Sequence, residues 1–209
     1  KEKSALIDGI SGRTLSYSEL RSQIDHLATG LHQRNFKKGD VCAVFCPNLP
    51  EYATIFLGVA AIGGINTTVN SLYSVNDLIH QFNDSKAKFL ITIPEFMDRA
   101  LPAAEKCGIE EIFVLGEAQG ATSFSELLRN DGVPPEVVID PKNDLVALPY
   151  SSGTTGLSKG VMLTHENLVS DMVLTTSINT LTDDDVLIGV LPFFHIYGMV
   201  LILNLAIFK

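Results

Sequence analysis

Residues 151–160 are the part of this sequence best equipped for chemistry. They read Ser151-Ser-Gly-Thr-Thr-Gly-Leu-Ser-Lys-Gly160. The glycines tolerate positive φ and leave backbone N–H groups uncovered, and successive N–H groups in such a turn form a concave anion site. The hydroxyls add hydrogen-bond donors for phosphate oxygens, and Lys159 adds a positive charge. The pattern therefore predicts a loop that holds the β- and γ-phosphates of a nucleotide.

Two other interpretations of this loop are weaker. A Walker A loop has the order G-x-x-x-x-G-K-[ST], whereas the order here is Gly153-x-x-Gly156-x-x-Lys159-Gly160, with no hydroxyl after the lysine. That order excludes a P-loop kinase or NTPase. A plain surface turn rich in serine and glycine would not explain why three glycines and a lysine stand between two apolar, strand-like segments.

A second candidate segment reads Leu191-Pro-Phe-Phe-His-Ile-Tyr-Gly198. Histidine can exchange protons near neutral pH, and tyrosine can hydrogen-bond a polar ligand. Taken alone, His195 would be a hydrogen-bonded core residue and Tyr197 a half-buried one. The remaining histidines belong to no motif, and His80 among them is expected only as a surface or helix-face residue. The acidic run 183–185 is expected to be a solvated turn.

Both segments resemble motifs of the adenylate-forming enzymes. Residues 151–160, with the following Val-Met-Leu-Thr-His-Glu-Asn, look like the signature loop of that superfamily, and residues 191–198 resemble its next motif, Pro-x-Phe-His with aromatic neighbours. The superfamily includes acyl-CoA synthetases, 4-coumarate–CoA ligases, firefly-type luciferases and peptide-synthetase adenylation domains. Pro149-Tyr150 and Phe194–Tyr197 resemble the 4-coumarate–CoA ligase and luciferase branch. Many members have proline where this chain has Ser158. The serine lacks the fixed φ that a proline would give the loop.

The resemblance implies a fold and a reaction. The fold would be α/β, with βαβ-type, mainly parallel sheets flanked by helices, as part of the large N-terminal domain of an adenylate-forming enzyme. The reaction would activate a small carboxylic acid with ATP and pass the acyl group to coenzyme A, as in a 4-coumarate–CoA ligase. A luciferase-like or fatty acyl-CoA synthetase parent, or a non-catalytic nucleotide-binding or interaction module, remain alternatives.

The resemblance also implies roles for individual residues. His195 and Lys159 would be the catalytic residues, with Lys159 adding charge at the leaving pyrophosphate and His195 standing where phosphates and carboxylate meet. His195 and Tyr197 would contact the acid substrate. The phosphates would be held by Ser151, Ser152, Gly153, Thr154, Thr155, Gly156 and Lys159. No metal ligand is assigned, because the acidic motif that holds Mg²⁺ in the superfamily cannot be placed in this sequence.

Apolar segments alternate with amphipathic ones, which predicts βαβ units and a mainly parallel sheet. Helices are expected after Ser18, after Asn48 as a cap, after Ser74 as a capping box, and after the cap Thr164. Strands are expected at 41–46, 65–69, 88–93, 112–115, 145–150 and 161–163. Residues 186–208 carry no charged side chain and are expected to form a buried strand, a loop and a buried helix.

A proline-rich break suggests the domain organisation. Residues 1–132 would form a first α/β subdomain region, 133–143 a linker or surface loop, and 144–209 the start of a nucleotide-binding region. The apolar end at Lys209 leads us to expect that the natural protein continues. The 209-residue chain should then be inactive without the missing C-terminal part of the same chain.

Composition limits the partners. The net charge of −9 argues against nucleic acid, because cationic side chains on phosphates provide most of that affinity. A membrane span is also not expected, since Pro192 and His195 interrupt the long uncharged run. The three cysteines match no metal-ligand spacing, and Cys42 and Cys46 are expected to be buried free thiols. No signal peptide is visible, so the expected location is intracellular, either cytoplasmic or peroxisomal.

Overall fold

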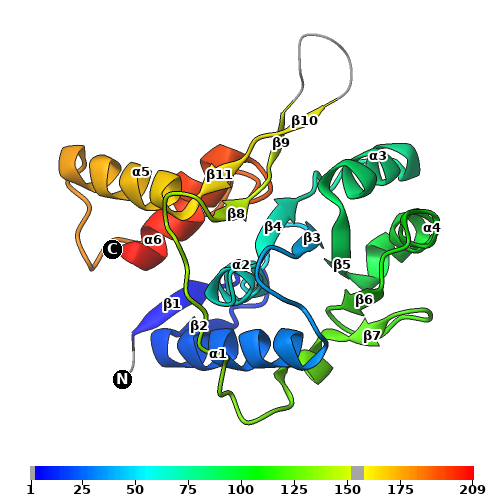
Figure 1. Cartoon of the computed structure of the whole chain (residues 1–209). Coiled ribbons are helices and arrows are strands. Elements are labelled where there is room, and N and C mark those ends of the chain that lie inside the picture. The colour runs from blue at the N-terminus through cyan, green and yellow to red at the C-terminus, as the bar shows by residue number, and fades with distance from the viewer. Residues whose placement is uncertain (1–2, 152–157) are drawn as a thin grey trace.

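The computed structural model describes residues 3–151 and 158–209, and its centre is a seven-stranded sheet. The strand order is β11-β8-β4-β3-β5-β6-β7 (Figure 1). All neighbours pair in parallel except β11, which is antiparallel to β8. The predicted α/β fold with a mainly parallel sheet is confirmed. The strands are β3 (Val41–Phe45), β4 (Ile65–Thr68), β5 (Ala87–Thr92), β6 (Glu111–Val114), β7 (Thr122–Ser123), β8 (Leu145–Ala147) and β11 (Leu163–Thr164).

Helices cover both faces of the sheet. Alternate residues of β3 point to opposite faces: Cys42 and Val44 belong to one core cluster, while Ala43 and Phe45 belong to the other. The first cluster includes apolar residues of α1 (Tyr17–Gln33) and α2 (Glu51–Ala61), and the second includes those of α3 (Val75–Ser85) and α4 (Met97–Cys107). The expected burial of Cys42 and Cys46 is confirmed, and burial raises the pKa of both thiols.

Smaller elements complete the fold. The N-terminal strands β1 (Ser4–Ile7) and β2 (Thr14–Ser16) form an antiparallel pair. The last third of the chain forms α5 (His165–Ile178), the π-helix η3 (Tyr197–Asn204) and α6 (Leu205–Phe208). Side chains of α5, η3 and α6 share a third core cluster with β8. Of two 3₁₀ turns, η1 (Pro94–Phe96) directly precedes α4 and η2 (Phe124–Leu128) directly follows β7.

Helix caps were partly predictable. Ser74 with Asp77 forms the expected capping box, and Thr164 caps α5 as expected. The prediction that Asn48 caps the next helix is wrong. The N-cap of α2 is Pro50, without a side-chain hydrogen bond, and the Asn48 side chain bonds a segment more than a hundred residues away.

Two predicted strands differ in the structure. The segment 145–150 divides into β8 and β9 (Tyr150–Ser151), and 161–163 is replaced by β10 (Lys159–Gly160) and β11. The chain leaves the large sheet at Leu148, whose N–H still donates to Asn66, and Pro149 has no N–H to extend the ladder. The two strands β9 and β10 then pair with each other in a separate hairpin.

The buried strand expected after Val186 is absent from the described structure. Residues 186–191 are irregular, and Val186, Ile188 and Val190 are exposed. A strand needs a neighbour for its backbone N–H and C=O groups, and no described strand pairs with this segment. The helix expected further along is confirmed as η3 and α6.

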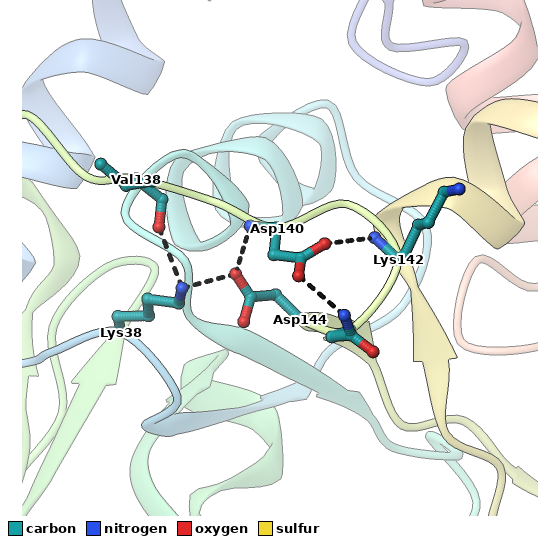
Figure 2. A network of polar contacts seen from close by, with 6 residues as sticks. Lys38, Val138, Asp140, Lys142 and Asp144 are labelled. Atoms are coloured by element: carbon teal, nitrogen blue, oxygen red, sulfur yellow. Dashed lines mark hydrogen bonds and ion pairs between the residues drawn. The ribbon is translucent and has the colours of Figure 1, made fainter.

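A polar network fixes part of segment 133–143, which was predicted as a linker or surface loop (Figure 2). Lys38, in the turn before β3, donates to the carbonyl of Val138 and forms an ion pair with Asp144. Asp144 accepts from the N–H of Asp140, and Asp140 in turn accepts from the N–H of Lys142. Beyond this network β8 joins the same sheet as β3 to β7. The subdomain division at 133–143 stays a prediction.

Candidate functional site

The β9–β10 hairpin carries the described ends of the predicted phosphate loop. Lys159 pairs with Ser151 and Gly160 with Tyr150, in antiparallel register. The hairpin rises beyond the edge of the large sheet, beside α3 (Figure 1). The lysine and one predicted phosphate ligand are thus paired across the base of the loop, and both are exposed. The other predicted ligands, Ser152, Gly153, Thr154, Thr155 and Gly156, lie outside the described residues.

The base of this hairpin is bonded to α3 on both strands. The Tyr150 hydroxyl donates to Oδ2 of Asp84 at 2.5 Å. On the opposite side of the hairpin, the carbonyl of Ser158, the residue before β10, accepts from Nε2 of His80 at 2.9 Å. Burial, followed by the bond to Asp84, raises the pKa of Tyr150, so its phenol keeps the proton that it donates. The rings of His80 and Tyr150 also pack edge to face, with their centroids 6.4 Å apart.

Asn48 holds the loop that leads to His195. Its Nδ2 donates to the carbonyls of Gly189 and Leu191, both at 2.8 Å, and its Oδ1 accepts from the N–H of Phe193 at 2.8 Å. One side-chain amide thus uses both donors and its acceptor on a single segment. Phe193 is buried and packs edge-on against Tyr52, with centroids 5.7 Å apart. The segment is therefore fixed both by polar bonds and by an aromatic anchor.

His195 follows this anchor on an exposed turn. Its N–H donates to the carbonyl of Pro192 at 3.1 Å, and its own carbonyl accepts from Met199 at 2.9 Å at the start of η3. The ring nitrogen Nδ1 accepts from the N–H of Tyr197 at 3.3 Å. A neutral imidazole whose Nδ1 accepts carries its proton on Nε2. His195 can therefore present an N–H donor to a ligand oxygen, and Tyr197 beside it is 51% exposed.

Both segments stand at the carboxyl edge of the parallel strands. Asn48 follows β3, Thr68 ends β4, and Leu148 follows β8. The hydroxyl of Thr68 donates to the carbonyl of Phe194 at 2.7 Å, directly before His195. In open α/β sheets ligands bind outside this edge. The structure thus attaches the β9–β10 hairpin, which carries the predicted phosphate loop, and the His195 segment to the same edge of one sheet.

Sequence reasoning missed the residues that hold these segments. They are Asn48, Thr67, Thr68, His80, Gln81 and Asp84. The available signal was polarity where a buried strand ends: Thr67 and Thr68 are the last two residues of β4, and Asn48 comes three residues after the end of β3. Their partners lie far along the chain, so no local pattern names them.

Residues 3–151 and 158–209 contain neither a metal-binding cluster nor a membrane-spanning helix. No three His, Cys, Asp or Glu side chains gather there as a metal site would require. In the acidic run, the Asp185 carboxylate accepts from Thr182, as a solvated turn would. In the same part of the chain, no helix combines the length and the apolar character that crossing a bilayer requires.

The comparisons with known proteins agree with this architecture. The chain is 39% identical to the probable 4-coumarate–CoA ligase 1 of Dictyostelium discoideum over 97% of its own length and 40% of that protein. Its fold matches a long-chain-fatty-acid–CoA ligase from Archaeoglobus fulgidus with a TM-score of 0.90 at 27% identity, over 99% of this chain and 42% of that one. ATP-bound MatB from Rhodopseudomonas palustris matches with a TM-score of 0.83 at 29% identity, over 95% and 39%.

These relatives are longer than the chain, which spans about 40% of the Dictyostelium ligase. The family model described as AMP-binding enzyme matches residues 1–209. With the parallel sheet, the hairpin and the histidine segment in place, this match leads to one conclusion: the chain belongs to the AMP-binding enzyme family.

Proposed function

We propose that this chain is the N-terminal part of an ATP-dependent carboxylate–CoA ligase. In the first step a carboxylate oxygen forms a bond to the α-phosphorus of ATP, the bond to pyrophosphate breaks, and an acyl adenylate results. In the second step the sulfur of coenzyme A bonds to the acyl carbon and AMP leaves. The pairing of Lys159 with Ser151 at the base of the phosphate hairpin, in a chain matched throughout by the AMP-binding model, carries this proposal.

The described residues suit the first step. Lys159 supplies positive charge where pyrophosphate departs, and preorganised charge of this kind is a major source of rate acceleration. His195 donates from Nε2 to an oxygen of the phosphates or the carboxylate. Ser151 adds a hydroxyl at the loop base, and Tyr197 borders the acid. Mg²⁺ would neutralise phosphate charge when bound, but the described residues offer it no ligand cluster, and no step here depends on it.

The acid is proposed from the relatives. Similarity to 4-coumarate–CoA ligases favours 4-coumarate or a related aromatic acid, and the Tyr197 hydroxyl can hydrogen-bond a phenolic substrate. Fatty acids are the competing class, because a long-chain-fatty-acid–CoA ligase shares the fold. With ATP and coenzyme A as its proposed substrates, we propose an intracellular location for the parent, in the cytoplasm or in peroxisomes.

Pyrophosphate release tests the proposal. The full-length protein should release pyrophosphate from Mg-ATP only when a suitable acid is present, and should form the CoA thioester when coenzyme A is added. The 209-residue chain should release no pyrophosphate under the same conditions. A preference for fatty acids would replace the aromatic substrate, and a full-length protein that binds ATP but releases no pyrophosphate with any acid would favour a non-catalytic nucleotide-binding module.

A further inference from the structure

A buried polar network lies at the carboxyl end of β4, between the two candidate segments. Thr67 and Gln81 have no exposed surface, and Thr68 is 2% exposed. Burying hydroxyl and amide groups costs free energy unless they are hydrogen-bonded. Apolar side chains would fill the same space without needing hydrogen bonds. The polar side chains at these three positions therefore point to a role for the bonds that they make.

The hydrogen bonds of the network run in one direction. Nε2 of Gln81 donates to Oγ1 of Thr67 at 2.8 Å and to the carbonyl of Thr68 at 3.1 Å. Because Oγ1 of Thr67 accepts this bond, its own hydrogen is left for the carbonyl of Leu148, at 3.1 Å. Gln81 of α3 thus sets the orientation of the Thr67 hydroxyl and also fixes the backbone of Thr68.

The two threonines bond different parts of the site. Adjacent residues of a strand point to opposite faces, so the hydroxyls of Thr67 and Thr68 reach different neighbours. Thr67 holds Leu148, two residues before Tyr150 and the phosphate hairpin. Thr68 holds Phe194, the residue before His195, at 2.7 Å. One pair of neighbouring residues therefore contacts both segments through their backbone carbonyls.

We propose that Thr67, Thr68 and Gln81 are positioning residues that set the phosphate hairpin and the His195 segment relative to each other. They act through Leu148 and Phe194 and do not touch substrate. This inference rests on the proposed function, because it assigns the two segments to one reaction. Positioning of reacting groups provides a large part of enzymatic rate enhancement, and small displacements of these segments should therefore reduce turnover.

The test compares two variants of the full-length protein at Thr68 with one variant at a matched buried threonine. Thr68→Val keeps the shape but removes the donor to Phe194, whereas Thr68→Ser keeps the donor. Thr92 provides the control: it has no exposed surface, ends β5, and donates to the carbonyl of Phe45 at 2.8 Å. Thr92→Val therefore removes an equivalent buried bond that contacts neither segment.

We expect Thr68→Val to lower kcat for acid-dependent pyrophosphate release about tenfold, the effect of about one lost hydrogen bond in the transition state. Thr68→Ser should restore most of that activity. Thr92→Val should lose about as much thermal stability as Thr68→Val, but its kcat should stay close to that of the wild type. Equal loss of kcat in Thr68→Val and Thr92→Val, or no loss in Thr68→Val, would overturn the proposal.

A second readout does not require activity. Amide hydrogen exchange at His195 and Met199 reports the turn that Thr68 supports, because both N–H groups are hydrogen-bonded there. Exchange should accelerate in Thr68→Val and not in Thr92→Val. If the wild type shows no acid-dependent release, the proposed function fails, while the exchange data still decide whether Thr68 holds this segment. Unchanged exchange in Thr68→Val would count against the positioning role.

Discussion

Asn48 and Phe193 are joined by a hydrogen bond of 2.8 Å, from the N–H of Phe193 to Oδ1 of Asn48, across 145 positions of sequence. The same amide donates to Gly189 and Leu191. A residue three positions after the end of β3 therefore holds the segment of the chain that enters the His195 turn. The bond links the first βαβ unit to a segment near the end of the chain, and it gives Asn48 a role beyond local structure.

Replacing Asn48 by alanine should release this segment. Asn48→Ala leaves two carbonyls and one N–H without a protein partner, and we expect the free energy of unfolding to fall by about 1–3 kcal/mol. Turnover of the full-length protein should fall as well, because His195 follows the released segment. Urea denaturation and pyrophosphate release measure the two effects. Asn76, exposed on α3, provides the control, and Asn48→Ala behaving like Asn76→Ala would show that the clamp is unimportant.

Tyr150 offers a separate test of the hairpin anchor. Tyr150→Phe removes the hydroxyl that donates to Asp84, so the base of the phosphate loop loses one attachment to α3. We expect about 1 kcal/mol less stability and a KM for ATP about fivefold higher, with a smaller change in kcat. Steady-state kinetics at varied ATP measures the split. Tyr17→Phe, which removes the hydroxyl that donates to the carbonyl of Ala206, is the control, and an unchanged KM in Tyr150→Phe would argue against the anchor.

The fold was largely predictable because its signals are local. Each signal depends only on residues close together in the sequence. Examples are the apolar run of β3, its alternation with amphipathic helices, and the capping box of Ser74 with Asp77. The apolar run at 186–191 also looked like a strand, but a strand forms only beside a partner, and none of the described strands lies beside it. A local pattern of residues indicates which secondary structure a segment can form. For a strand, the presence of a neighbouring strand decides whether that structure forms.

The site was predictable only in part. The segments 151–160 and 191–198 stood out by composition, since glycines, hydroxyls, a lysine and a histidine in those contexts are uncommon. Their supports did not stand out, because the contact of Thr68 with Phe194 spans 126 positions and that of His80 with Ser158 spans 78. Such contacts arise from the topology of the sheet. The assigned roles of Ser151, Lys159, His195 and Tyr197 stay predictions until they are measured.

The linker network should make stability depend on pH. The hydrogen bond and ion pair with Lys38 hold the pKa of Asp144 below its ordinary value of 3.8. A carboxyl whose folded pKa is lowered stabilises the protein above its unfolded pKa, and that contribution is lost as pH falls through the folded value. Lys38→Met should therefore reduce the loss of stability between pH 5 and pH 3, measured by urea denaturation. Lys142→Met, at an exposed linker lysine, should keep the wild-type pH dependence, and an identical pH dependence in both variants would contradict this role.

Lys159 gives the sharpest test of the chemistry itself. Its side chain is exposed at the hairpin base, so Lys159→Met should fold with wild-type stability. If the ammonium stabilises the departing pyrophosphate, the variant of the full-length protein should lose about 100-fold in adenylation rate, as for removal of one preorganised group at a developing charge. Exchange of labelled pyrophosphate into ATP isolates this step from thioester formation. Thioester formation from a supplied acyl adenylate should stay near the wild-type rate, because that step breaks no pyrophosphate bond. Equal losses in both half-reactions would instead indicate that Lys159 maintains the structure of the site.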